Sequence, residues 1–189
     1  MSLSDAELHA MGQAQFVDDL PLPQGALFAQ PVLSPVAHAE LEAIETLEAL
    51  ACPGVVAVLT AQDIPGLNRI GNVAEDEVLF PVREIVYHGQ PVALVVAETQ
   101  AQAREVAKRV IVRYQTLPAI FDAREADRLG MHIAPRQTFA CGDVIAAWAG
   151  CATLVEGSAA SGAQEHVYLE TQSAIAYPVD HQTLKVTSA

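Results

Sequence analysis

The sequence predicts an α+β fold. Over residues 12–121, short apolar runs alternate with segments whose apolar residues recur at helical spacing. From residue 130 onward the pattern changes to segments that are mostly strand-like. Hydrophobic residues make up 51% of the 189 residues, which suffices for a packed core and argues against disorder. We therefore expect one mixed α/β domain over 12–121 and the beginning of a second, truncated α+β domain over 130–189.

The strands of the first domain are predicted from runs rich in β-branched and other apolar residues. These runs are Leu27–Leu33, Ala39–Ile44, Val55–Leu59, Val92–Ala97 and Ile111–Tyr114. Ser34-Pro35 is expected to end the first of them, and no helix is expected to follow directly, because the residue before a proline is driven out of the helical conformation. Ahead of them, Gly12–Pro21 is expected to be a short strand followed by an acidic turn.

The helices are predicted from caps and spacing. Thr99-x-x-Gln102 is a capping box, and apolar residues follow it at helical spacing as far as Val110. On its polar side, Glu105 and Arg109 form an i,i+4 pair of opposite charge. Shorter helices are expected at Thr46–Leu50, Thr60–Asp63, Asp122–Leu129 and Asp143–Trp148.

The C-terminal third reads as strand and loop. Strands are expected at Ala152–Gly157, Glu165–Tyr177 and Thr183–Thr187. Because the chain stops in an apparent strand with no polar tail, we expect that the strands pairing with it are missing from this sequence. A loop is predicted at Leu67–Asp76, which is polar and contains glycine and asparagine.

Composition excludes several functional classes. A net charge of −13 repels phosphate backbones, so no nucleic-acid partner is expected. No apolar run approaches the roughly 18 residues of a membrane-spanning helix, and no signal peptide is visible, so we expect a cytoplasmic protein without a membrane partner. The cysteines, Cys52, Cys141 and Cys151, are too few for an iron–sulfur site in this chain. The histidines are scattered, so no protein-ligated metal is expected.

The densest polar chemistry lies in Gln164–Thr171, which holds an amide, two carboxylates flanking an imidazole, and a phenol. Taken alone, alternation favours a half-exposed strand with Val167 and Leu169 facing a core. Two other motifs also have plain interpretations. His88–Pro91 is predicted to be a turn with Gly89 at positive φ, although Gly89 and Gln90 could instead approach a cofactor or partner. Asp18-Asp19 is predicted to be a solvated turn.

Ordered blocks of the chain resemble the molybdenum hydroxylases, the xanthine dehydrogenase and aldehyde oxidase family. Gln164–Glu170 is similar to that family's Gln-Glu-His-Phe-Tyr-Leu-Glu segment, with Val167 in place of the aromatic residue. The other matching blocks are Gly12–Pro21, Pro53–Val55 with Thr60–Gly66, Val92–Ala97 with Val112–Ala119, and Gly142–Val144. The resemblance implies a hammerhead-like α/β domain over 12–121 and the start of a molybdopterin-binding domain over 130–189.

The resemblance also implies a function. The expected enzyme is a xanthine dehydrogenase-type molybdenum oxidoreductase that hydroxylates a purine with oxygen from water. It would pass electrons through iron–sulfur clusters and FAD, on other domains or subunits, to NAD. Gln164 maps onto the position beside the molybdenum–molybdopterin cofactor. Glu165 and His166 are expected to hold the strand and turn that carry Gln164 in place. The family's catalytic Glu lies beyond Ala189, so no catalytic residue is expected in this chain, which alone is expected to be inactive.

Alternatives remain open at this stage. The same family includes enzymes that act on an aldehyde, carbon monoxide or another heterocycle, and the residues that choose the substrate lie outside this sequence. A non-catalytic module that docks the iron–sulfur subunit is a further alternative.

Overall fold

The computed structural model describes residues 4–71, 76–170 and 172–189. It divides into two compact units, Pro23–Arg136 and Met1–Leu22 together with Gln137–Ala189. The predicted domain boundaries, 12–121 and 130–189, remain a prediction. Part of the predicted loop Leu67–Asp76, residues 72–75, lies outside the described residues.

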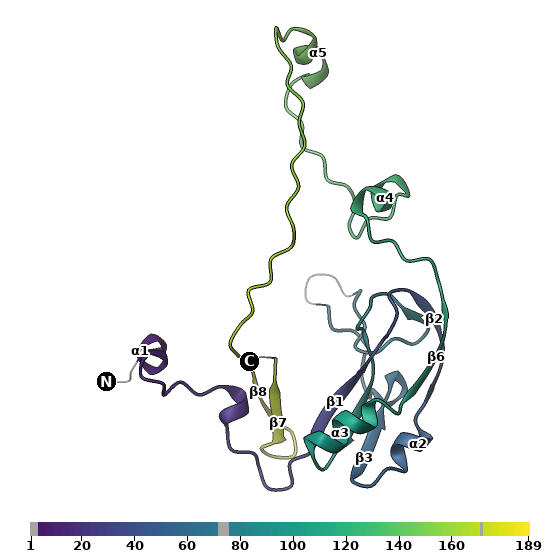
Figure 1. Ribbon diagram of the computed structural model, residues 1–189, viewed down its shortest axis with the longest axis vertical. Coiled ribbons are helices and arrows are strands. Elements are labelled where there is room, and N and C mark those ends of the chain that lie inside the picture. Colours follow the sequence, from purple (N-terminus) through teal and green to yellow (C-terminus); the bar gives the residue numbers. More distant parts are fainter. Residues whose placement is uncertain (1–3, 72–75, 171) are drawn as a thin grey trace. The chain divides into compact units, whose positions relative to one another are not determined.

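The larger unit is built on two antiparallel sheets (Figure 1). In one sheet, β5 (Pro91–Ala97) lies between β1 (Phe28–Leu33) and β3 (Val55–Leu59). In the other, β2 (Ala39–Glu45) lies between β4 (Glu84–Ile85) and β6 (Ile111–Thr116). These elements confirm the predicted strands; β4, with two residues, is an addition that was too short to show any periodicity.

Helix α3 (Gln100–Ala107) packs against the β1–β5–β3 sheet, and its N-cap Thr99 accepts a hydrogen bond from the Gln102 backbone N–H at 3.2 Å, as the capping signal predicts. Lys108 and, more weakly, the predicted partner Arg109 attract Glu105 and lower the pKa of that carboxyl. The direct ion pair of Glu105 is with Lys108 at 2.7 Å, and the Arg109 guanidinium donates to the Cys52 sulfur at 3.4 Å. The i+3 neighbour therefore competes successfully with the i+4 neighbour.

The core of this unit lies where the two sheets and α3 meet. It joins Val32, Val92 and Val95 from the first sheet to Ile85 from the second and Val106 from α3. Helix α2 (Leu47–Leu50) adds the buried Ala49. The remaining elements of the unit are the 3₁₀ helix η2 (Ala61–Asp63), capped by Thr60, and α4 (Ala123–Arg128), capped by Asp122.

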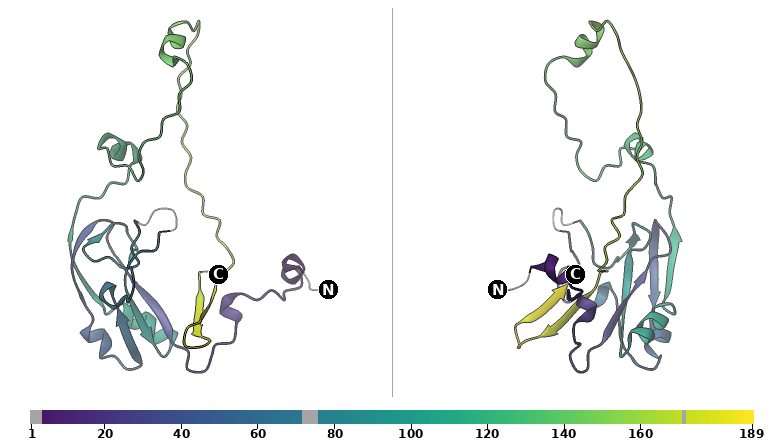
Figure 2. Two further views of the ribbon diagram at one scale, coloured as in Figure 1. Left: turned by 180° about the vertical axis from the view of Figure 1, so that it is seen from behind. Right: turned by 60° about the vertical axis from the view of Figure 1, so that its left-hand side comes forward.

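The smaller unit contains α1 (Asp5–Ala10), the 3₁₀ helix η1 (Val17–Asp19), α5 (Val144–Ala149) and the hairpin of β7 (Ala174–Pro178) and β8 (Leu184–Ser188). In both figures η1 lies beside the hairpin (Figures 1 and 2). The strand predicted within Gly12–Pro21 is wrong, because this segment folds into η1. The predicted strand Ala152–Gly157 is also wrong: these residues are exposed and belong to no helix or strand.

An imidazole ties the second sheet to the chain that follows it. The Nδ1 atom of His38 lies 2.6 Å from the Pro118 carbonyl oxygen, and Nε2 lies 2.7 Å from Oε1 of Glu84. Both partners are acceptors, so both ring nitrogens must carry a proton to satisfy them. The Pro118 carbonyl, followed by the Glu84 carboxylate, therefore raises the pKa of His38.

This geometry predicts a pH-dependent stability. A raised pKa in the folded state means that the stabilisation is fully present below the unfolded value of about 6.5 and is lost as the pH rises through the raised folded value. We expect the urea midpoint to fall across this window in the unmodified protein and to stay flat in His38→Gln. The control, His181→Gln, removes an exposed imidazole with no ion pair in the described part of the chain, and should keep the slope. An unchanged slope in His38→Gln would contradict the assignment.

Candidate functional site

Every residue of Gln164–Leu169 is exposed, and the segment belongs to no helix or strand. The predicted strand Glu165–Tyr177 begins only at Ala174, so Gln164, Glu165 and His166 lie on extended chain ahead of it. Its interpretation as a half-buried strand is wrong as well, because Val167 and Leu169 are 78% and 83% exposed. A strand needs a neighbour to pair with, and no strand of the described residues pairs with this segment. Thr171 lies outside the described residues.

Local contacts shape this segment. Oε1 of Glu165 accepts a hydrogen bond from the backbone N–H of Val167 at 3.3 Å. Val167 has φ of 53°, a left-handed conformation that is an outlier for a β-branched residue. On either side of it, the rings of His166 and Tyr168 stack with centroids 6.0 Å apart and planes 8° apart. The segment is therefore bent at Val167 rather than straight.

The side chain of Gln164 has no hydrogen-bond partner among the described residues. Its amide offers two N–H donors and one carbonyl acceptor, without charge. Of the predicted site residues, the structure thus leaves Gln164 free to bind a ligand and engages Glu165 and His166 in local contacts.

A residue outside the predicted set connects this segment to the N-terminal part of the chain. Glu170 is half-buried, and its Oε1 accepts a hydrogen bond from the backbone N–H of Val17 at 2.8 Å. The two residues are 153 positions apart, so no local spacing could have indicated the contact. The only sequence signal was that Glu170 and Val17 both belong to blocks that resemble the same family.

The structure agrees with the simple, non-catalytic interpretation of His88–Pro91 and of Asp18-Asp19. Gly89 has φ of 85°, and the buried amide oxygen of Gln90 accepts from the Val86 backbone N–H at 2.8 Å, so this turn binds its own chain. Asp19 Oδ2 accepts from the Phe16 backbone N–H at 3.0 Å and caps η1, while Asp18 is exposed. Neither motif offers a free acid–base pair.

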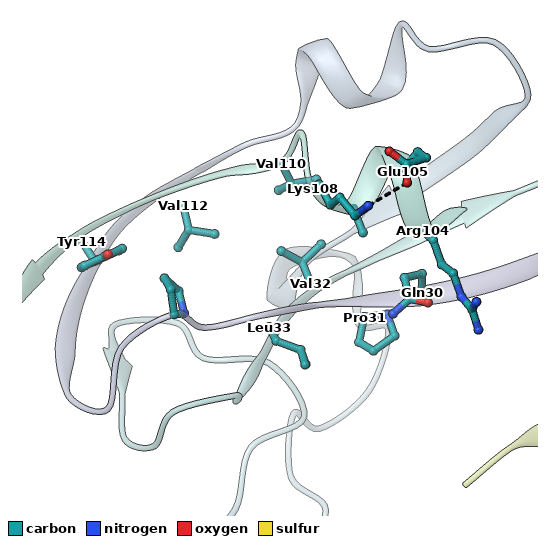
Figure 3. A pocket seen from close by; sticks show the side chains of 12 residues that line it. Gln30, Pro31, Val32, Leu33, Arg104, Glu105, Lys108, Val110, Val112 and Tyr114 are labelled. Atoms are coloured by element: carbon teal, nitrogen blue, oxygen red, sulfur yellow. Dashed lines mark hydrogen bonds and ion pairs between the residues drawn. The ribbon is translucent and has the colours of Figure 1, made fainter. Parts of the chain in front are cut away.

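The larger unit carries a groove of about 650 Å³ between β1, α3 and β6 (Figure 3). Apolar Val32, Val110 and Val112 line it together with Arg104, and Figure 3 shows the carboxylate of Glu105 engaged by Lys108. None of the predicted site residues lies in this groove. Its one lining carboxylate is held in an ion pair, so the groove shows no arrangement for acid–base chemistry.

Residues 4–71, 76–170 and 172–189 contain no group of three or more His, Cys, Asp or Glu side chains that could hold a metal ion. Cys52, Cys141 and Cys151 are free thiols. Within the same residues, no helix has the length and apolar character to cross a bilayer.

Two family models match the chain in order. Residues 11–118 match the aldehyde oxidase and xanthine dehydrogenase a/b hammerhead domain. Residues 127–189 match the molybdopterin cofactor-binding domain. The second match contains the whole segment Gln164–Glu170.

The chain is similar to proteins named aldehyde oxidase and xanthine dehydrogenase. Aldehyde oxidase 4 of Cavia porcellus is 42% identical over 90% of this chain and 12% of its own length. Xanthine dehydrogenase of Dictyostelium discoideum is 35% identical over 97% of this chain and 13% of its own length. Among solved structures, the aldehyde oxidoreductase of Desulfovibrio gigas superposes with a TM-score of 0.84 and 30% identity, over 97% of this chain and 22% of that one. The chain thus spans about an eighth of the curated relatives.

Proposed function

The chain belongs to the aldehyde oxidase and xanthine dehydrogenase family of molybdenum hydroxylases, and from this membership we propose that it is part of an enzyme that oxidises a purine. The enzyme takes oxygen from water and passes electrons through iron–sulfur and FAD centres to NAD. The observation that carries this proposal is the order of the two family matches, a hammerhead domain followed by a molybdopterin-binding domain. Several relatives named xanthine dehydrogenase, each 35% or 36% identical over more than nine-tenths of the chain, favour a purine.

The residues present fit the cofactor. Gln164 carries an unpartnered, uncharged amide on an exposed segment, which suits a donor to an electron-rich acceptor atom of a bound cofactor. When bound, the molybdenum–molybdopterin cofactor supplies the two-electron oxidation, as cofactors do where amino acids lack the chemistry. The amide of Gln164 would orient and polarise rather than transfer protons.

The neighbours of Gln164 would hold its segment in shape. Glu165 accepts from the Val167 N–H, and His166 stacks on Tyr168, so both act on the bend beside Gln164. Such supporting residues tune how a site residue is presented. The catalytic base, the iron–sulfur centres and FAD would come from other parts of the protein or from partner subunits. For this reason residues 1–189 alone are expected to be inactive.

An aldehyde is the second candidate substrate. It is favoured by the higher identity, 42%, to aldehyde oxidase 4 and by the superposition on an aldehyde oxidoreductase. The replacement of the family's aromatic residue by Val167 leaves a smaller side chain in the segment that would lie beside the cofactor.

A substrate comparison on the complete enzyme tests the proposal. We expect kcat/KM with xanthine or hypoxanthine, and NAD as acceptor, to exceed kcat/KM with an aromatic aldehyde of similar size. Faster turnover of the aldehyde would overturn the purine assignment and support the second candidate. Absence of turnover with both classes would contradict both.

A further inference from the structure

One hydrogen bond fixes the end of the segment that carries Gln164. Every residue from 127 to 169 is exposed, and Glu170 is the first residue after this run that is partly buried. Its Oε1 lies 2.8 Å from the backbone nitrogen of Val17. Both residues belong to the same compact unit. The exposed segment therefore ends at Glu170, where the chain becomes partly buried again.

Val17 is a firm point of attachment. Its side chain is only 6% exposed, in an N-terminal region that is otherwise mostly exposed. Its N–H is the first of η1, and the opening N–H groups of a helical turn lack partners within the turn. Asp19 satisfies the N–H of Phe16, and Glu170 satisfies the next one, that of Val17. A carboxylate suits this place, because charge-assisted hydrogen bonds to backbone N–H groups are stronger than neutral ones.

The chain between Gln164 and Glu170 is short and has a defined local conformation. The bend at Val167, the Glu165 bond to its N–H and the stacked rings of His166 and Tyr168 all lie within it. Among the described residues no cation pairs with Glu170, so the hydrogen bond from Val17 is the contact that holds its carboxylate. A shift of Glu170 would consequently be carried to Gln164.

We infer that Glu170 is a positioning residue, whose carboxylate, bound by the N–H of Val17, sets the place of Gln164 against the cofactor. The inference rests on the proposed function, because it requires Gln164 to act at the cofactor. Glu170 itself need not touch the cofactor or the substrate. Its effect passes through Gln164, so loss of either residue should lower kcat to the same extent.

The test uses the complete enzyme and four variants: Glu170→Ala, Glu170→Gln, Gln164→Ala and the double variant with Ala at both positions. Glu170→Gln keeps an amide oxygen that can accept from Val17, so it is the conservative rescue. The matched control is Glu156→Ala, which removes an exposed carboxylate with no partner in the described chain. The readouts are amide hydrogen exchange over residues 12–22 and kcat per bound molybdenum.

In Glu170→Ala, exchange at the Val17 amide should accelerate by about tenfold, the effect of losing one hydrogen bond to a charged acceptor. Its kcat should fall to that of Gln164→Ala, and the double variant should match either single variant within about twofold. Glu170→Gln should keep most of the protection and the turnover, and Glu156→Ala should change neither.

Unchanged exchange in Glu170→Ala would overturn the anchor. Losses that multiply in the double variant would show that Glu170 acts independently of Gln164, and would overturn the positioning role. Wild-type turnover in Gln164→Ala would instead refute the assigned role of Gln164. The exchange data would still report on the anchor in that case, so the two failures are distinguishable.

Discussion

In the complete enzyme, Gln164→Ala is expected to lower turnover per bound molybdenum by about tenfold to a hundredfold, the usual effect of losing one hydrogen bond to a charged or strongly polar acceptor that strengthens in the transition state. The amide is neutral, so the charge of the site does not change. The molybdenum content should fall little, because a pterin cofactor is held by many other contacts. Steady-state kinetics normalised to molybdenum, together with metal analysis, separate the two effects.

Gln164→Glu is the matched variant, with nearly the same size. It should lose more turnover than Gln164→Ala, because a carboxylate would face an electron-rich acceptor atom and could not donate when ionised. If Gln164→Ala turned over like the unmodified enzyme with full molybdenum content, Gln164 would be scaffold. Equal losses in the Ala and Glu variants would contradict the donor role.

The strands and helices of the larger unit could be predicted because each carries its own local signal. β-Branched runs marked β3 and β5, and Thr99 with Gln102 marked the start of α3. The same capping signal is present at Ser4-x-x-Glu7, where no helix was predicted. There it opens α1, with the Ser4 backbone N–H bound to the Glu7 carboxylate at 2.8 Å. That helix has six residues and no buried side chain, so it lacks the apolar stripe that makes longer helices visible in a sequence.

The errors lie where local sequence is not decisive. Alternation in Glu165–Tyr177 was consistent with a strand, but whether a segment becomes a strand depends on a neighbour, which the sequence does not specify. Among the described residues of this segment, pairing begins at Ala174, where Ala174–Pro178 pairs with Leu184–Ser188. The positive φ of Val167 could not be predicted either, because β-branched residues disfavour it.

The candidate site likewise contains residues that a local motif could predict and a contact that it could not. Gln164, Glu165 and His166 were identified from a contiguous motif. The contact between Glu170 and Val17 was not, since it joins the two ends of the chain and involves a backbone N–H that every residue except proline possesses. The contact arises only from the folded arrangement of the smaller unit.

The proposed enzyme hydroxylates its substrate with oxygen from water. This chemistry differs from that of oxygenases, in which dioxygen supplies the inserted atom. Because the source of oxygen is a property of the reaction and not of its rate, the result does not depend on the electron acceptor used or on the fraction of enzyme that holds its cofactor.

The source of oxygen can be measured by letting the complete enzyme convert xanthine over many turnovers in water labelled with heavy oxygen, followed by mass spectrometry of the product. A large excess of substrate over enzyme makes any oxygen that each site held beforehand a negligible share of the product. We expect the inserted oxygen to carry the label of the water, and a matched reaction under labelled dioxygen in ordinary water to give an unlabelled product. Label arriving from dioxygen would show instead that the enzyme is an oxygenase.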